Sequence, residues 1–158
     1  MKVAVISISD RAARGDYEDL SGPEIEKALR SRFPDAVVSR AIVPYEEDRI
    51  LSALHAAESS DFIITTGGTG ISPRDITPEV TARFYEKEIP GISEALREAS
   101  RGETPFAMLS RGRAGLRGHC IVVNFPGSLK AVQLCMTVIT PIMEHAIRML
   151  DGEGHSSR

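Results

Sequence analysis

Apolar and polar positions along the chain follow two alternating periods. Short runs rich in Val and Ile, typical of buried strands, occupy residues 3–8, 36–43, 61–66 and 119–125. Apolar residues three and four positions apart, typical of amphipathic helices, occupy 21–33, 46–60, 77–89, 92–100 and 129–150. This alternation predicts an α/β fold, a three-layer sandwich whose mostly parallel sheet is flanked by helices on both faces.

Local signals refine these elements. Ser21 and Thr77 are expected to cap the helices that follow them. Pro141 is expected to kink or divide the last helix. Residues 102–118 are rich in glycine and arginine and have no clear period, so we expect them to form a loop.

Length and composition indicate one domain. The 158 residues include 42% hydrophobic and 26% charged residues, close to the average for a globular protein, and no linker or repeat interrupts them. We expect a single domain over 1–150 and a flexible tail over 151–158. The formal net charge of −3 gives no general attraction to nucleic acid, so an anionic ligand would need a local site.

Cysteine usage and apolar run lengths favour a cytoplasmic protein. Cys120 and Cys135 lie far apart in apolar surroundings, and we expect buried, reduced thiols rather than a disulfide or a zinc site. The apolar run at the N-terminus is too short for a signal peptide. No run approaches the ~20 apolar residues of a membrane span, so no membrane association is expected.

Three polar loops directly follow predicted strands, at residues 7–16, 65–75 and 124–128. The carboxyl ends of parallel strands meet at one edge of a sheet, and α/β proteins bind their ligands there. We therefore expect these three loops to converge and to form the functional site.

The loop at 65–75 reads TTGGTGISPRD, with three glycines and three threonines in its first six residues. Its glycine spacing matches neither the phosphate-binding GxxxxGK[ST] loop nor the dinucleotide-binding GxGxxG pattern. Two interpretations stay open from the residues alone. Backbone amides and threonine hydroxyls could hold an anion, or the glycines could simply supply the positive φ angles of a tight turn.

Arg74 and Asp75 end this loop. A carboxylate beside a phosphate site favours a divalent cation between them, and Mg²⁺ commonly binds one or two carboxylates together with substrate phosphates. The alternatives are that Asp75 only marks the start of the next helix, and that Arg74 pairs with an internal carboxylate rather than a phosphate.

The longer stretch TTGGTGISPRDITPEV resembles the signature of the molybdenum-cofactor biosynthesis domain. That domain is shared by molybdopterin adenylyltransferases of the MogA type, by MoaB proteins and by the G domain of gephyrin. Three further stretches are similar to the family in the same order: SISDRAARGDYEDLSGP, VPYEEDRI and TPFAMLSRGRAGLRGHCIVVNFPGSLKAV. The resemblance covers nearly the whole chain, and four fragments in this order and spacing are highly specific.

This resemblance implies a MogA-like α/β fold, commonly a homotrimer, with adenylyl transfer as its reaction. The terminal phosphate of molybdopterin would attack the α-phosphorus of ATP, giving adenylyl-molybdopterin and pyrophosphate. Mg²⁺ would be the cofactor, with ATP and molybdopterin as substrates. A molybdenum-inserting protein would be the partner that receives the product.

Carried over position by position, the resemblance also implies the site residues. The nucleotide side would comprise Ser9, Asp10, Gly67, Gly68, Thr69 and Gly70. The molybdopterin side would comprise Ser110, Arg111, Asn124, Pro126, Gly127 and Ser128. Asp75 would be the essential catalytic carboxylate and the metal ligand. Without the resemblance, Ser110 and Arg111 are typical of a mobile loop with a solvated arginine, and Asn124 of a residue that ends a strand.

One position departs from the family pattern. Where the adenylyltransferases carry an aspartate associated with catalysis, after the proline of VPDE, this chain has Tyr45 followed by Glu46. Either Glu46 replaces that aspartate, or Mg²⁺ binding depends more heavily on Asp75, or activity is weakened. The alternative to an active enzyme is therefore a non-catalytic molybdopterin carrier or a weakened MoaB-like paralogue. A scaffold role is disfavoured, because the sequence contains no second domain to organise.

Overall fold

Three strands are buried almost throughout: β1 (Lys2–Ile8), β3 (Phe62–Thr66) and β6 (Cys120–Phe125). Strands buried on both faces are typical of the middle of a parallel sheet covered by helices. In this computed structural model, which describes residues 1–153, they form the centre of a six-stranded sheet with the order β2-β1-β3-β6-β5-β4. β1 runs parallel to both β2 (Val37–Val43) and β3, and β3 runs parallel to β6.

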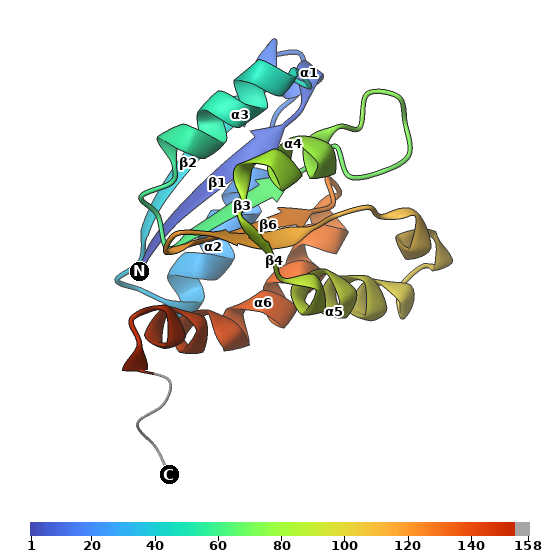
Figure 1. Cartoon of the computed structure of the whole chain (residues 1–158). Coiled ribbons are helices and arrows are strands. Elements are labelled where there is room, and N and C mark those ends of the chain that lie inside the picture. The colour runs from blue at the N-terminus through green and yellow to red at the C-terminus, as the bar shows by residue number, and fades with distance from the viewer. Residues whose placement is uncertain (154–158) are drawn as a thin grey trace.

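Helices cover both faces of this sheet (Figure 1). α3 (Glu47–Ala56) and α4 (Thr77–Phe84) pack on one face, and α2 (Ser21–Arg32), α5 (Pro90–Arg101) and α6 (Leu129–Leu150) pack on the other. Side chains of the central strands alternate between the two cores: Val5 and Ile64 face α2, α5 and α6, whereas Ile6 and Ile63 face α3 and α4. The predicted three-layer α/β sandwich is confirmed.

The prediction of a loop over 102–118 is wrong. It contains a 3-10 helix, η1 (Pro105–Leu109), and a strand, β5 (Ala114–Arg117), which pairs antiparallel with β6. The short turn between these strands contains Gly118, whose φ of 54° suits a tight hairpin. The predicted helix over 77–89 ends early, at Phe84, and β4 (Lys87–Glu88) follows it and pairs antiparallel with β5 at the sheet edge.

Two predicted helix caps are also wrong. Ser21 is the first residue of α2 rather than its cap, and the amides of Ser21 and Gly22 donate hydrogen bonds to Oδ1 of Asp19, each at 3.1 Å. Thr77 is the first residue of α4 rather than its cap, and its hydroxyl donates to the Gly67 carbonyl at 2.9 Å. Asp19 also accepts a hydrogen bond from the Ser7 hydroxyl of β1 at 2.6 Å, so it links the start of α2 to the sheet, and Thr77 links the start of α4 to Gly67.

The remaining structural expectations are met in part. α6 runs through Pro141 without being divided. Cys120 and Cys135 are free and buried, as predicted, and burial raises the pKa of each thiol to about 12. Among the residues that the structure describes, no helix has the length and apolar character needed to cross a membrane. The predicted tail at 151–158 lies outside the described residues from 154 onward.

Candidate functional site

The three polar loops meet at the carboxyl edge of the parallel strands, as predicted. The amide of Gly67 donates to the Phe125 carbonyl at 3.2 Å, and the Thr66 hydroxyl donates to the Pro126 carbonyl at 2.8 Å. The glycine loop (residues 65–75) is thus joined to the loop that follows β6. It also lies against the end of β1, since a Cβ at Gly67 would collide with the carbonyl oxygen of Ile8.

Gly67 and Gly68 are glycines for reasons internal to the fold. Their φ angles of 101° and 67° are ones that other residues rarely adopt. A Cβ at Gly68 would also collide with the Thr77 hydroxyl and lie 2.7 Å from Cε1 of Tyr45. A tight turn therefore explains these two glycines, and evidence for a ligand must come from the cavities beside them.

Two cavities open beside the glycine loop. The first, the apolar cavity, has a volume of about 290 Å³, and the second, the loop cavity, about 330 Å³. Of the expected site residues, the apolar cavity is lined by Thr69, Gly70, Ser110, Asn124, Pro126 and Ser128. The loop cavity is lined by Ser9, Gly67, Gly127 and Ser128. The expected nucleotide and molybdopterin residues are therefore mixed between the two cavities rather than divided one to each.

Ser128 lies on the wall that the two cavities share. It is the N-cap of α6, and its hydroxyl oxygen accepts a hydrogen bond from the Ala131 amide at 3.3 Å. The first amides of a helix carry partial positive charge and favour anions. The shared wall is consequently a place where both cavities can receive a phosphate group.

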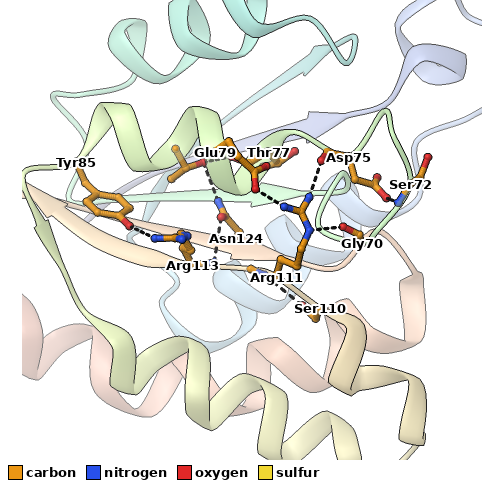
Figure 2. A network of polar contacts seen from close by, with 12 residues as sticks. Gly70, Ser72, Asp75, Thr77, Glu79, Tyr85, Ser110, Arg111, Arg113 and Asn124 are labelled. Atoms are coloured by element: carbon orange, nitrogen blue, oxygen red, sulfur yellow. Dashed lines mark hydrogen bonds and ion pairs between the residues drawn. The ribbon is translucent and has the colours of Figure 1, made fainter.

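Arg111 makes several hydrogen bonds to the glycine loop (Figure 2). Its backbone amide donates to the Thr69 carbonyl at 2.8 Å. Its guanidinium donates to the carbonyls of Gly70 and Asp75, each at 2.6 Å, and pairs with Glu79. Three partners fix the guanidinium, so Arg111 is not the solvated arginine of a mobile loop. Its charge is already paired with Glu79, and its contacts hold the glycine loop in place.

Asp75 and Arg74 are adjacent in sequence but face different partners. The Asp75 carboxylate accepts a hydrogen bond from the Ser72 amide at 2.9 Å. It also lies beside Gly70, where a Cβ would be 2.9 Å from its Oδ2. The Arg74 guanidinium pairs with the carboxylate of Asp10. Two partners were considered for Arg74, a phosphate or a carboxylate of the protein, and in this structure Arg74 pairs with a carboxylate of the protein.

Asp10 connects the loops that follow β1 and β2. Its Oδ1 accepts a hydrogen bond from the Tyr45 amide at 2.9 Å, and its Oδ2 pairs with Arg74. The Tyr45 amide, opposed by partial burial and supported by Arg74, lowers the pKa of Asp10 below its usual value of 3.8. Asp10 and Asp75 both lie outside the linings of the two cavities, but only Asp10 has protein partners on both carboxylate oxygens, which suits it to holding the loops together.

Asn124 is buried near the end of β6, and both the nitrogen and the oxygen of its side-chain amide make hydrogen bonds (Figure 2). Its amide nitrogen donates to the hydroxyls of Thr65 at 2.9 Å and Thr81 at 3.0 Å. Its oxygen accepts from the Arg113 amide at 3.1 Å. It lines the apolar cavity while linking β3, α4 and the segment before β5.

Tyr45 lines the loop cavity, whereas Glu46 does not. Burial, followed by the charges of Asp75 and Asp10, raises the pKa of Tyr45 above its usual value of 10.0. The phenol is consequently a neutral hydrogen-bond donor at physiological pH. Glu46 is exposed at the start of α3, and its carboxylate caps no amide there. That Glu46 replaces the family aspartate stays a prediction.

The contribution of α5 was not predicted. Ser93, Leu96, Arg97 and Ser100 all line the apolar cavity. Their spacing of three, four and seven residues places them on one helical face. The signal was present in the sequence, but a face that mixes serine and arginine is equally typical of a surface turned to solvent.

The chain belongs to the family described as a probable molybdopterin binding domain, whose model matches residues 4–145. The molybdopterin adenylyltransferase of Helicobacter pylori (strain J99) is 36% identical over 154 residues, which cover 95% of this chain and 88% of that protein. The chain spans only 25% of another relative, the molybdenum cofactor synthesis protein cinnamon of Drosophila melanogaster, at 38% identity over 94% of this chain.

Solved structures of the same family share the fold. The molybdopterin biosynthesis enzyme MoaB from Thermus thermophilus superposes with a TM-score of 0.86 at 35% identity, covering 96% of both chains. A MogA structure superposes with a TM-score of 0.89 at 35% identity, covering 95% of this chain and 99% of the other. The expected MogA-like fold is thereby confirmed.

Proposed function

We propose that this protein transfers the adenylyl group of ATP to the terminal phosphate of molybdopterin. The observation that carries the proposal is the wall at Ser128, where the apolar cavity and the loop cavity meet beside the glycine loop and the first turn of α6. Two phosphate-bearing substrates, one in each cavity, would bring their phosphates together there. The activity in the name of the Helicobacter pylori relative supports this choice of substrates.

The reaction requires positioning and charge neutralisation more than covalent participation by the protein. A phosphate oxygen of molybdopterin would form a bond to the α-phosphorus of ATP, and the bond from that phosphorus to the leaving pyrophosphate would break. The Thr69 hydroxyl and the Gly70 amide, which lie on the apolar cavity, would hold phosphate oxygens. The N-terminal amides of α6 would favour the same negative charge.

Asp75 is the residue that would hold Mg²⁺, the ion that neutralises phosphate charge during such transfers. One of its carboxylate oxygens accepts from the Ser72 amide, and within residues 1–153 no hydrogen-bond donor reaches the other. A single carboxylate with a free oxygen suits a cation that takes its remaining ligands from substrate phosphates and water. Asp10 is a poorer candidate, since both of its oxygens already have protein partners.

A second candidate function is supported by Tyr45. A molybdopterin carrier, or a paralogue with weakened activity, would keep the cavities but lack the carboxylate that the family has at this position. Glu46 is exposed and does not itself line either cavity, which favours this alternative. The Tyr45→Asp variant separates the two: a large gain in turnover would support the weakened paralogue, and unchanged or reduced turnover would support an enzyme adapted to tyrosine.

Turnover of ATP with molybdopterin tests the main proposal. The wild-type protein should form adenylyl-molybdopterin in the presence of Mg²⁺, and Asp75→Asn should abolish the product while molybdopterin binding persists. Asp48→Asn, which changes an exposed carboxylate on α3, is the matched control and should keep full activity. Pterin binding with no product at saturating substrate would reject the enzyme and leave the carrier.

We also propose a homotrimer that acts in the cytoplasm and passes its product to a molybdenum-inserting protein. Exposed apolar side chains at Ile71, Phe106, Met108 and Leu109 support an interface between copies near the site. Buried free thiols support a reducing compartment. Light scattering of the wild type and of Phe106→Asp tests the assembly, and a monomeric wild type would reject it.

A further inference from the structure

A third cavity adjoins the apolar cavity and has charged walls. This charged cavity has a volume of about 380 Å³ and shares Ser93, Arg97, Ser110 and Gly112 with the apolar cavity. Its charged lining residues are Arg97, Arg111, Arg113, Glu79 and Glu88. Three arginines against two glutamates leave its walls with one positive charge in excess.

Arg97 is the source of that excess charge. Arg111 pairs with Glu79, and Arg113 pairs with Glu88 at 3.2 Å. In the described part of the chain, no carboxylate oxygen lies within 4.0 Å of the Arg97 guanidinium. Within residues 1–153, the guanidinium makes one hydrogen bond, from Nη1 to the Gly112 carbonyl at 2.8 Å.

The surroundings of Arg97 favour an anionic ligand. The Arg97 side chain is only partly exposed. It lies between the apolar cavity, whose lining includes Leu96 and Ala107, and the charged cavity. A guanidinium has five N–H donors, and a partly buried charge is costly when it is unpaired. The hydroxyl of Ser110 lies on the same two cavities and donates its hydrogen to no residue within 1–153.

The same position is close to the glycine loop. Gly112, which accepts the hydrogen bond from Arg97, is two residues from Ser110 and next to Arg111. The Arg111 amide donates to the carbonyl of Thr69, so this segment runs beside the loop. An anion between Arg97 and Ser110 would therefore lie on the glycine-loop side of the apolar cavity.

We propose that Arg97 and the Ser110 hydroxyl form an anion subsite that holds the phosphate monoester of the acceptor substrate. The remainder of that substrate fills the apolar cavity, whose lining also includes Thr69, Gly70 and Ser128, and Arg97 orients the phosphate toward the glycine loop and the wall at Ser128. The identity of the anion rests on the proposed function, whereas the existence of the subsite does not. Arg97 binds and positions the nucleophilic oxygen and exchanges no proton with it.

A phosphate titration followed by NMR tests the subsite independently of catalysis. Inorganic phosphate should shift the Arg97 Nε–H signal and the Ser110 amide saturably, whereas chloride at equal ionic strength should not. Arg97→Gln should weaken phosphate binding at Ser110 about tenfold or more, the loss expected for a charge-assisted hydrogen bond. Arg97→Lys should restore part of that affinity, because it keeps the charge. Arg101→Gln, on the same helix but exposed, should change nothing.

Steady-state kinetics then identify the source of the anion. Arg97→Gln should raise KM for molybdopterin about tenfold or more with a much smaller change in kcat and an unchanged KM for ATP. A rise in KM for ATP instead would mean that the subsite holds a nucleotide phosphate, and the proposal would be rejected. Non-saturable shifts, or equal losses in Arg97→Gln and Arg101→Gln, would reject the subsite itself. A wild type that binds phosphate at Arg97 but shows no turnover would reject only the adenylyl-transfer function.

Discussion

A Cβ atom at Gly68 would lie 2.7 Å from Cε1 of Tyr45, so the tyrosine ring lies directly against bare glycine backbone. This contact joins the glycine loop to the one position where the chain departs from the family motif. The ring fills space beside the turn that a shorter aspartate would leave open. Tyr45 is therefore part of the packing that shapes the loop as well as a wall of the loop cavity.

Substitution of Gly68 should show how strongly this turn depends on glycine. Gly68→Ala introduces a Cβ at a φ of 67° and against both Thr77 and Tyr45, so it should lower the free energy of unfolding by about 2 kcal/mol or more. Urea denaturation measures this. Gly91→Ala is the control, since nothing lies within 4 Å of its Cβ position in the first turn of α5. A loss in Gly68→Ala no larger than in the control would contradict the packing described here.

Asn124 should contribute to stability as well as to the cavity wall. Asn124→Ala leaves the Arg113 amide without its acceptor and removes two hydrogen bonds to buried threonine hydroxyls. We expect the free energy of unfolding to fall by about 2–3 kcal/mol. Gln133→Ala, which removes an exposed amide bonded to Glu24, should change it by less than about 0.5 kcal/mol. Chemical denaturation that finds the two variants equally stable would show that the Asn124 hydrogen bonds are dispensable.

The depressed pKa of Asp10 predicts a specific pH dependence. Because the folded state favours the ionised carboxylate, the stabilisation from Asp10 is fully present above its usual pKa of 3.8. It is lost as the pH falls through the lower pKa of the folded state. The stability difference between wild type and Asp10→Asn should therefore be constant at neutral pH and shrink as the pH falls below 3.8. Unfolding curves over this range measure it, and a difference that grows in acid would contradict stabilisation of the ionised carboxylate by the Tyr45 amide and Arg74.

Much of the fold could be predicted because its strands are apolar and its helices periodic. β1, β3 and β6 are buried on both faces and therefore have continuous runs of Val and Ile. β5 could not be recognised in the same way, since its sequence AGLR carries little strand preference and its stability comes from pairing with β6. The two-residue β4 has no sequence signal of its own.

The candidate site was predictable in its location but less so in its contacts. Parallel strands bring their following loops together, which is a property of topology and needs no side-chain detail. The partner of Arg74 depends on how the loop after β1 and the glycine loop pack together. That partner is Asp10, which is far from Arg74 in the sequence. Arg97 was missed for a similar reason, because only the packing of α5 turns it toward a cavity.

The most direct test of the central claim is the fate of the α-phosphate of ATP. The wild-type protein is incubated with molybdopterin, Mg²⁺ and ATP radiolabelled either at the α- or at the γ-phosphate, and the pterin product is isolated. Adenylyl transfer predicts that the α-label enters the pterin product and the γ-label is released in pyrophosphate. Transfer of the γ-label to the pterin, or the absence of both labels from pterin that is demonstrably bound, would contradict adenylyl transfer.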